Sequence, residues 1–202
     1  MKMRIGLPLA AAVAVCAGAA TAAINTIDEF TGDYFEGYET QPHGQFLPSY
    51  DVFAPTDSVV RQLGAGQGLH ITSGWSFFYV IYPHGGNYFM GGAGVNAEYV
   101  FDVPAKRFGG FFGTNADVPD FVATFYDEDG NNLGQLPGGA PLGNWKWNGW
   151  ETDGAGIKTV QIVSNNQYHG FIMMDDLQYT PIPGPGALAL LALGGLWRRR
   201  RR

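Results

Sequence analysis

The stretch FVATFYDEDGNN, residues 121–132, decides the fold class. In its first half Phe121, Ala123 and Phe125 share one parity, and the residues between them share the other. A period of two is typical of a strand with one buried face, and the Asp-Gly dipeptide that follows is a favoured hairpin turn. Residues 121–132 therefore predict a strand that ends in a tight turn.

The same pattern recurs outward from this stretch. Period-two alternation also marks residues 158–164 and 171–179. Further strands are expected at 25–30, 33–39, 68–72, 76–82, 96–103 and 107–114. Glycine-rich segments, among them 90–92 and 137–139, are expected to be turns. Short strands with such turns predict an all-β domain over residues 24–180, a two-sheet antiparallel β-sandwich of the jelly-roll type.

Composition and charge exclude several classes of protein. The chain has 202 residues, of which 30 are glycine, 14% are aromatic and only 15% are charged. A disordered chain would have the opposite balance, and a helical bundle would be richer in Ala, Glu, Lys and Leu. Residues 24–180 contain five basic residues and all eighteen acidic ones, a net charge of −13. This charge argues against nucleic acid as a partner and against docking onto anionic lipid.

Residues 1–23 have the layout of a secretory signal peptide. A basic start precedes an apolar run, and the small residues Ala20, Ala22 and Ala23 follow. We therefore expect signal peptidase to cut after Ala22 or Ala23. The alternatives are a buried first helix or a membrane anchor. Because Cys16 is the only cysteine, the exported body would contain no disulfide.

Residues 181–202 have the features of a C-terminal sorting signal. They comprise Pro183, Gly184 and Pro185, an apolar stretch at 187–197, and the basic end Arg198, Arg199, Arg200, Arg201 and Arg202. Eleven apolar residues predict a short hydrophobic helix of about 16 Å, less than the roughly 20 residues that a comfortable membrane span needs. The arginines are expected to stay on the cytoplasmic side during export. The tail is thus a transient sorting anchor or, alternatively, a permanent tail anchor.

This tail resembles the PEP-CTERM sorting domain of bacterial exported proteins. Pro183-Gly184-Pro185 stands where that family has Pro-Glu-Pro, and the apolar helix and arginine cluster follow in the same order. The resemblance implies an exosortase-like membrane protease as a partner. It also implies export, with the cell surface or the extracellular matrix as the destination.

The body has its own resemblance. An acidic and aromatic opening at 33–38 and an apolar closing strand at 171–179 resemble the jelly-roll domains of exported PEP-CTERM proteins, which are similar in shape to carbohydrate-binding modules. Their first and last strands often pair, with a structural calcium nearby. The resemblance implies one calcium held by Glu36 with Asp175 or Asp176, whose carboxylates are suitable ligands. Alternatively, the two aspartates cap turns or face solvent.

Aromatic residues suggest the ligand surface. Five residues form this candidate: Asn144, Trp145, Trp147, Asn148 and Trp150. Trp145 and Trp147 are two positions apart, on one face of a strand, where exposed rings would stack on a sugar while the asparagines bind its hydroxyl groups. The alternative is that these rings belong to the core. The segment 75–82 is a second aromatic candidate, with the alternation of a strand covered on both faces.

The sequence offers no catalytic motif. The body has no cysteine, no Gly-x-Ser-x-Gly elbow and no HExxH pair. It therefore predicts an exported, non-catalytic module that binds an extracellular polysaccharide. A self-associating structural matrix protein is the alternative. A carboxylate-based glycoside hydrolase is a third hypothesis, since carboxylate pairs are plentiful here.

Overall fold

The computed structural model describes residues 23–183, which contain strands and no helix. No helix in this range could cross a membrane. The strands are β1 Ile24–Ile27, β2 Tyr34–Glu36, β3 Phe46–Leu47, β4 Ser49–Asp51, β5 Val59–Leu63, β6 Gly68–Thr72, β7 Trp75–Ser76, β8 Val80–Ile81, β9 Phe89–Ala93, β10 Asn96–Thr114, β11 Asp120–Tyr126, β12 Asn132–Gly139, β13 Lys146–Thr152, β14 Ile157–Ser164 and β15 Ile172–Pro181.

The two expected flanking helices lie outside the described residues. So do most residues of the predicted signals: Ala20, Ala22, Gly184, Pro185, Arg198, Arg199, Arg200, Arg201 and Arg202. Export, cleavage and sorting therefore stay predictions.

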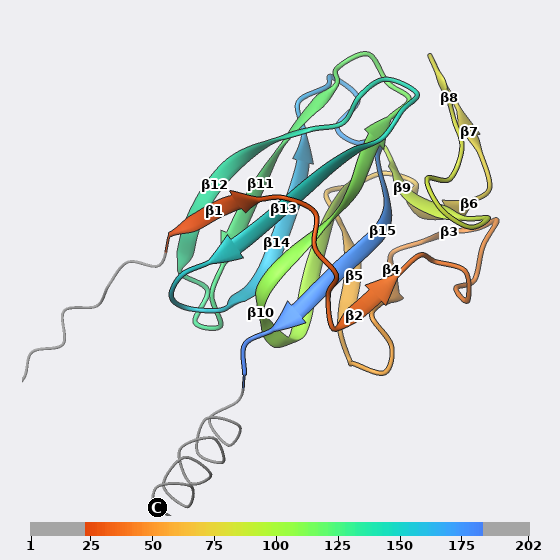
Figure 1. Cartoon of the computed structure of the whole chain (residues 1–202). Coiled ribbons are helices and arrows are strands. Elements are labelled where there is room, and N and C mark those ends of the chain that lie inside the picture. Colours follow the sequence, from red (N-terminus) through yellow and green to blue (C-terminus); the bar gives the residue numbers. More distant parts are fainter. Residues whose placement is uncertain (1–22, 184–202) are drawn as a thin grey trace, which may run out of the picture.

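The strands form two antiparallel layers (Figure 1). The first layer has the order β12-β11-β14-β10-β5-β4, and the second begins β1-β13-β10-β15. In the second layer β15 also pairs with β2 and with β9, and β9 continues to β6 and β3. The predicted all-β class and antiparallel sandwich are confirmed, while the jelly-roll assignment stays a prediction.

Strand β10 connects the two layers. Its first part pairs with β5 and β14, and its second part pairs with β13 and β15. The register shifts between Val100 and Ala105, where the strand passes from one layer to the other. The sequence predicted two strands, 96–103 and 107–114. The structure has one strand of 19 residues, although its pairing with neighbouring strands stops at Val100 and resumes at Ala105.

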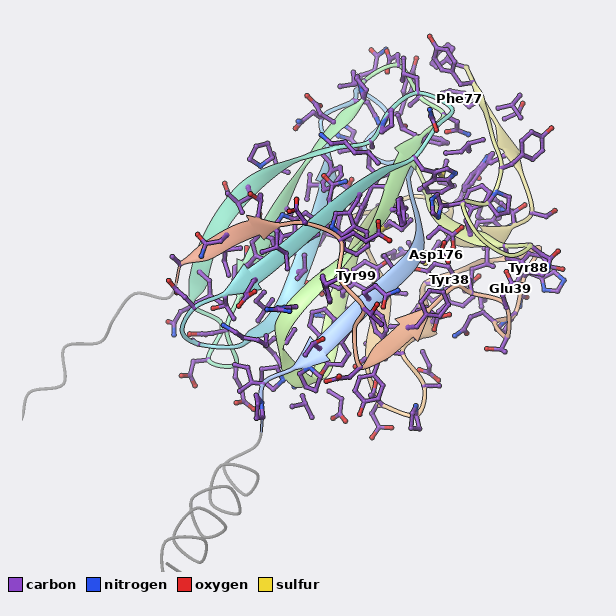
Figure 2. All side chains as sticks on the ribbon, viewed as in Figure 1. Tyr38, Glu39, Phe77, Tyr88, Tyr99 and Asp176 are labelled. Carbon is purple, nitrogen blue, oxygen red and sulfur yellow. The ribbon has the colours of Figure 1, made fainter. Side chains whose placement is uncertain are left out.

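Aromatic rings fill the space between the layers. From the second layer Phe112 and Trp150 meet Phe121 and Phe125 of the first. All four side chains are at most 1% exposed. Figure 2 shows Tyr38 and Tyr99 in the interior as well, where their hydroxyl groups are 3.0 Å apart. Burial of this apolar area at about 25 cal/mol per Å² is the main stabilisation of a domain without disulfides.

Two segments predicted as turns are strands. Residues 90–92 belong to β9, and 137–139 belong to β12. In β9 the glycines are required by close contact: a Cβ at Gly91 would collide with the Met173 sulfur, and one at Gly92 with the Val95 carbonyl oxygen. Their glycine content therefore reflects packing rather than a turn.

The opening and closing strands pair as expected. Strand β2 lies antiparallel to β15, and Glu36 is opposite Leu177. The first strand of the described range, β1, pairs instead with β13. The topology thus brings the predicted carboxylates into neighbouring strands, and the side chains decide whether they meet.

Candidate functional site

The structure separates the three tryptophans that the sequence grouped. Trp150 is 1% exposed and packs among core phenylalanines, so it offers no surface to a ligand; its assignment to a sugar platform is wrong. Trp145 is half-buried against Ile81, Phe89 and Met173, and its indole N–H donates to the Tyr82 carbonyl at 2.9 Å. Trp147 is half-buried and lines a surface groove, to which the buried Trp150 contributes only an edge of the wall. Trp145 precedes β13 and does not line this groove.

That groove, here called the tryptophan groove, lies between β1, β12 and β13. Its volume is about 390 Å³, and it is lined by Thr26, Ile27, Pro137, Gly138, Gly139, Lys146, Trp147, Asn148, Gly149 and an edge of Trp150. The Trp147 ring lies over Gly109 and Gly149, since a Cβ at either position would come within 2.8 Å of the indole. Its N–H donates to the Ile27 carbonyl at 3.4 Å, which fixes the ring.

The side chains of the two asparagines of the predicted site form hydrogen bonds with the protein's own backbone. Asn144 accepts the backbone N–H of Trp145 at 2.8 Å. Asn148 joins β13 to β12, because it accepts the Gly139 N–H at 2.9 Å and donates to the Gly139 carbonyl at 2.8 Å. Both side chains therefore shape the loop and the groove, with few hydrogen bonds left for a ligand.

A second surface has more exposed aromatic area than the first. The aromatic hairpin, residues 75–82, consists of β7, a turn and β8, and projects from one end of the sandwich (Figure 1). Its exposed rings include Phe78 at 55% and Tyr82 at 68%. The amides of Phe78 and Tyr79 both donate to the carbonyl of Asn115, the residue that follows β10, and these bonds hold the turn in place. The expectation of a strand covered on both faces is wrong.

An open groove of about 470 Å³ lies beside the hairpin and is here called the aromatic groove. It is lined by Phe46, Ala65, Gly66, Gln67, Trp75, Ala93, Gly94 and Phe171, without an ionisable side chain. Phe46 comes from β3 and is 44% exposed, whereas Phe171 directly precedes β15. Five separate segments thus build this groove, which is why sequence spacing does not reveal it.

Ring contacts continue from the groove onto the hairpin. The Trp75 ring meets the Phe46 and Phe171 rings with centroids 6.3 and 6.0 Å apart. Phe171 stacks on Phe77 at 5.0 Å with an interplanar angle of 7°, and Phe77 also contacts Tyr168. Phe77 itself belongs to the hairpin, where Figure 2 labels it. The one sequence signal for this surface is the uncharged run WSFFYVIY at 75–82.

The three carboxylates predicted to hold calcium make contacts with other groups of the protein. Glu36 accepts the backbone N–H groups of Tyr38 and Phe53 at 2.7 and 3.1 Å. Asp175, fully buried, accepts those of His84 and Gly85 at 2.8 and 3.2 Å. Burial raises the pKa of Glu36, and burial with the neighbouring Asp176 charge raises the pKa of Asp175 to about 7.

Asp176, at the bulge of β15, contacts the His84 ring nitrogen Nδ1 at 2.7 Å. Within residues 23–183 no three His, Cys, Asp or Glu side chains gather in a geometry suited to a metal ion. The arrangement does not provide the six to eight oxygens that calcium takes. Calcium binding stays a prediction, to be checked as a higher melting temperature in calcium than in EDTA.

No family model matches the chain, and no curated protein matches it. Among solved structures, the K2 adhesin domain of Lys-gingipain aligns at 14% identity over 78% of this chain and 99% of that one, with a TM-score of 0.49. The CBM22-1 xylan-binding domain of Paenibacillus barcinonensis Xyn10C aligns at 10% identity over 77% and 100%, with a TM-score of 0.47. TmCBM61 in complex with β-1,4-galactotriose aligns at 15% identity over 73% and 95%, with a TM-score of 0.44.

Similarities of this size carry no argument about what this chain binds. Because no family model matches, the resemblance of residues 181–202 to a PEP-CTERM tail also stays a prediction. The function is therefore argued from the two grooves.

Proposed function

We propose that this protein is a non-catalytic module that binds a neutral polysaccharide in the aromatic groove. The observation that carries the proposal is that Phe46, Trp75 and Phe171 line an open groove that has no ionisable side chain. Aromatic faces stack on the C–H faces of sugar rings, and ligand sites combine such apolar walls with a few polar groups. Here Gln67 and the backbone of Gly66 and Gly94 supply the polar groups.

Two further features favour a neutral glycan. The rings are held in place before binding, Phe46 by stacking on His70 at 4.5 Å and Trp75 by its edge against the same imidazole at 5.2 Å. Pre-ordered side chains reduce the entropic cost of binding. In addition, the net charge of −13 over residues 24–180 repels a polyanion in general.

The test is affinity gel electrophoresis of the full chain in gels that contain neutral polysaccharides, such as xylan, galactan or β-glucan. Phe46→Ala removes one of the three stacking rings and is expected to weaken binding about tenfold, which corresponds to about 1.4 kcal/mol. Phe35→Ala is the matched control, since Phe35 is 55% exposed on β2 and does not line the groove. Absence of binding to every polysaccharide, or equal loss in both variants, would contradict the proposal.

Self-association is a second candidate function, favoured by the exposed apolar side chains of the aromatic hairpin. Phe77, Phe78, Tyr79 and Val80 are each between 45% and 55% exposed. Patches of this kind mark interaction sites. Sedimentation velocity of the full chain without sugar separates the two functions: a dimer that Phe78→Ser converts to a monomer favours self-association, and a monomer at every concentration excludes it.

The proposal includes export of the module and its delivery by the C-terminal tail. Signal peptidase would remove residues up to Ala22 or Ala23, and an exosortase-like protease would recognise residues 181–202. The mature protein would then belong to the cell surface or the extracellular matrix. Intact-mass measurement on protein from its native host tests this step: a mass that includes the five C-terminal arginines indicates a permanent anchor instead of sorting.

A further inference from the structure

The basic side chains of the domain differ in what they contact. Arg61 pairs with Glu98, Lys106 and Arg107 both pair with Glu151, and Lys158 donates to the Asp102 carbonyl at 2.8 Å. Lys146 is exposed, and within residues 23–183 its ammonium group forms neither an ion pair nor a hydrogen bond. In a domain with a large excess of acidic residues, a cation left without an acidic partner is available to a ligand.

Lys146 lines the tryptophan groove, although its side chain is also exposed to solvent. Its Cδ and Nζ atoms are each 3.0 Å from the position that a Cβ of Gly139 would occupy, so the side chain folds over the end of β12. No acidic side chain lines this groove. The ammonium group therefore faces a volume of about 390 Å³ in which it is the only charge.

Trp147 provides the second element of the same groove. Its ring rests on the paired glycines Gly109 and Gly149. The rings of Phe30 and Phe111 pack against it in T-shaped pairs, with centroids 5.7 and 5.4 Å from its own. An aromatic ring fixed beside a lysine combines a stacking surface with a cation. This pair of groups matches a sugar ring that bears a carboxylate.

We propose that the tryptophan groove is a second glycan site, specific for a uronic acid residue in an otherwise neutral oligosaccharide. Trp147 stacks on the sugar ring, and Lys146 binds its carboxylate. A single uronate suits the groove better than a polyanion does, because the groove holds one cation and the rest of the domain is acidic. The site is independent of the aromatic groove, which has no charge to recognise.

The test compares one oligosaccharide in two forms. Glucuronosyl-xylotriose as the free acid and as its neutral methyl ester are titrated against the full chain by calorimetry, and the measured quantity is the ratio of the two affinities. A charge-assisted hydrogen bond predicts that the acid binds about tenfold more tightly than the ester. Lys146→Gln is expected to bring this ratio to about one, since no charge then distinguishes the two ligands.

Lys158→Gln is the matched control, because it removes the same charge at a half-buried position outside the groove. The ratio is expected to be unchanged in it. Three results would each overturn the proposal. The first is an affinity ratio of one in the parent protein, and the second is a ratio that Lys146→Gln does not change. The third is an affinity ratio that decreases equally in Lys146→Gln and Lys158→Gln. Neutral polysaccharide binding that Phe46→Ala leaves unchanged, with this ratio intact, would overturn the proposed function and leave the uronate site standing.

Discussion

The two aromatic grooves differ in how the chain builds them. The tryptophan groove takes most of its lining from two segments, 137–139 and 146–150, joined by a short connection. The aromatic groove collects Phe46, Trp75 and Phe171 from segments that are far apart in the sequence. The tryptophan groove can thus be recognised from residues that are close together in the sequence, whereas the aromatic groove can be recognised only in the folded structure. The grooves also differ in charge, since Lys146 lines one and no ionisable side chain lines the other.

The largest loss of folding stability is expected at Trp150, the buried tryptophan of the 145–150 cluster. Trp150→Ala should lower the free energy of unfolding by about 3–5 kcal/mol, because it empties a site among four buried phenylalanines. Trp147→Ala, on the half-buried ring of the groove, should cost about 1–2 kcal/mol. Urea unfolding of both variants measures the difference. Equal losses would show that the two rings share one environment.

The next effect concerns the glycines beneath the two indoles. A Cβ at Gly91 would be 2.9 Å from the Trp75 ring, and one at Gly109 would be 2.8 Å from the Trp147 ring. Gly91→Ala and Gly109→Ala should each destabilise the domain by about 1–3 kcal/mol through overpacking. Gly91→Ala should also weaken neutral polysaccharide binding, and Gly109→Ala should reduce the preference for the uronate.

Gly74→Ala serves as the control for this pair, because its nearest neighbours are carbon atoms of the Tyr82 ring at 3.3 Å. Its cost in urea unfolding should be smaller than that of either variant. If Gly91→Ala and Gly109→Ala weakened both ligands alike, the two grooves would be one site rather than two.

The regular part of the fold could be predicted, since it depends on local alternation. Residues 121–126, 158–164 and 171–179 alternate with period two and lie in β11, β14 and the region of β15. Strand β9 could not be predicted, because the need for Gly91 and Gly92 comes from Met173 and Val95, which only the fold brings near. The same holds for the tryptophans: their spacing does not tell which ring is buried, because the burial of Trp150 depends on Phe121 and Phe125 of the opposite layer.

A pH effect is expected between the two grooves, where Asp175 holds the loop at His84 and Gly85. Burial and the charge of Asp176 raise the pKa of Asp175 to about 7, so the folded state binds a proton that the unfolded state releases at lower pH. Stability contributed by this group should therefore fall as pH rises from about 4 to about 7, by at most about 1.4 kcal/mol for each pH unit.

Asp175→Asn should make that dependence shallower, because the amide does not titrate. Urea unfolding at a series of pH values measures the slope in the parent protein and the variant. A slope unchanged by Asp175→Asn would assign the dependence to another group, and Glu128→Gln, a change at an exposed carboxylate, gives the comparison.

The smallest expected effect, on the ratio of the two affinities, tests whether the position of the Lys146 ammonium group beside Trp147 matters for recognition. Gly139→Ala places a methyl group 3.0 Å from the Lys146 ammonium, so the side chain must move while Trp147 keeps its place. The ratio of uronate to methyl ester affinity should fall about twofold, a change of roughly 0.4 kcal/mol. In the Lys146→Gln background the same substitution should have no effect on the ratio, because the charge it displaces is gone. A double-mutant cycle isolates that coupling from any general loss of stability. If Gly139→Ala lowers the ratio equally in both backgrounds, the position of the ammonium group over β12 plays no part in recognition.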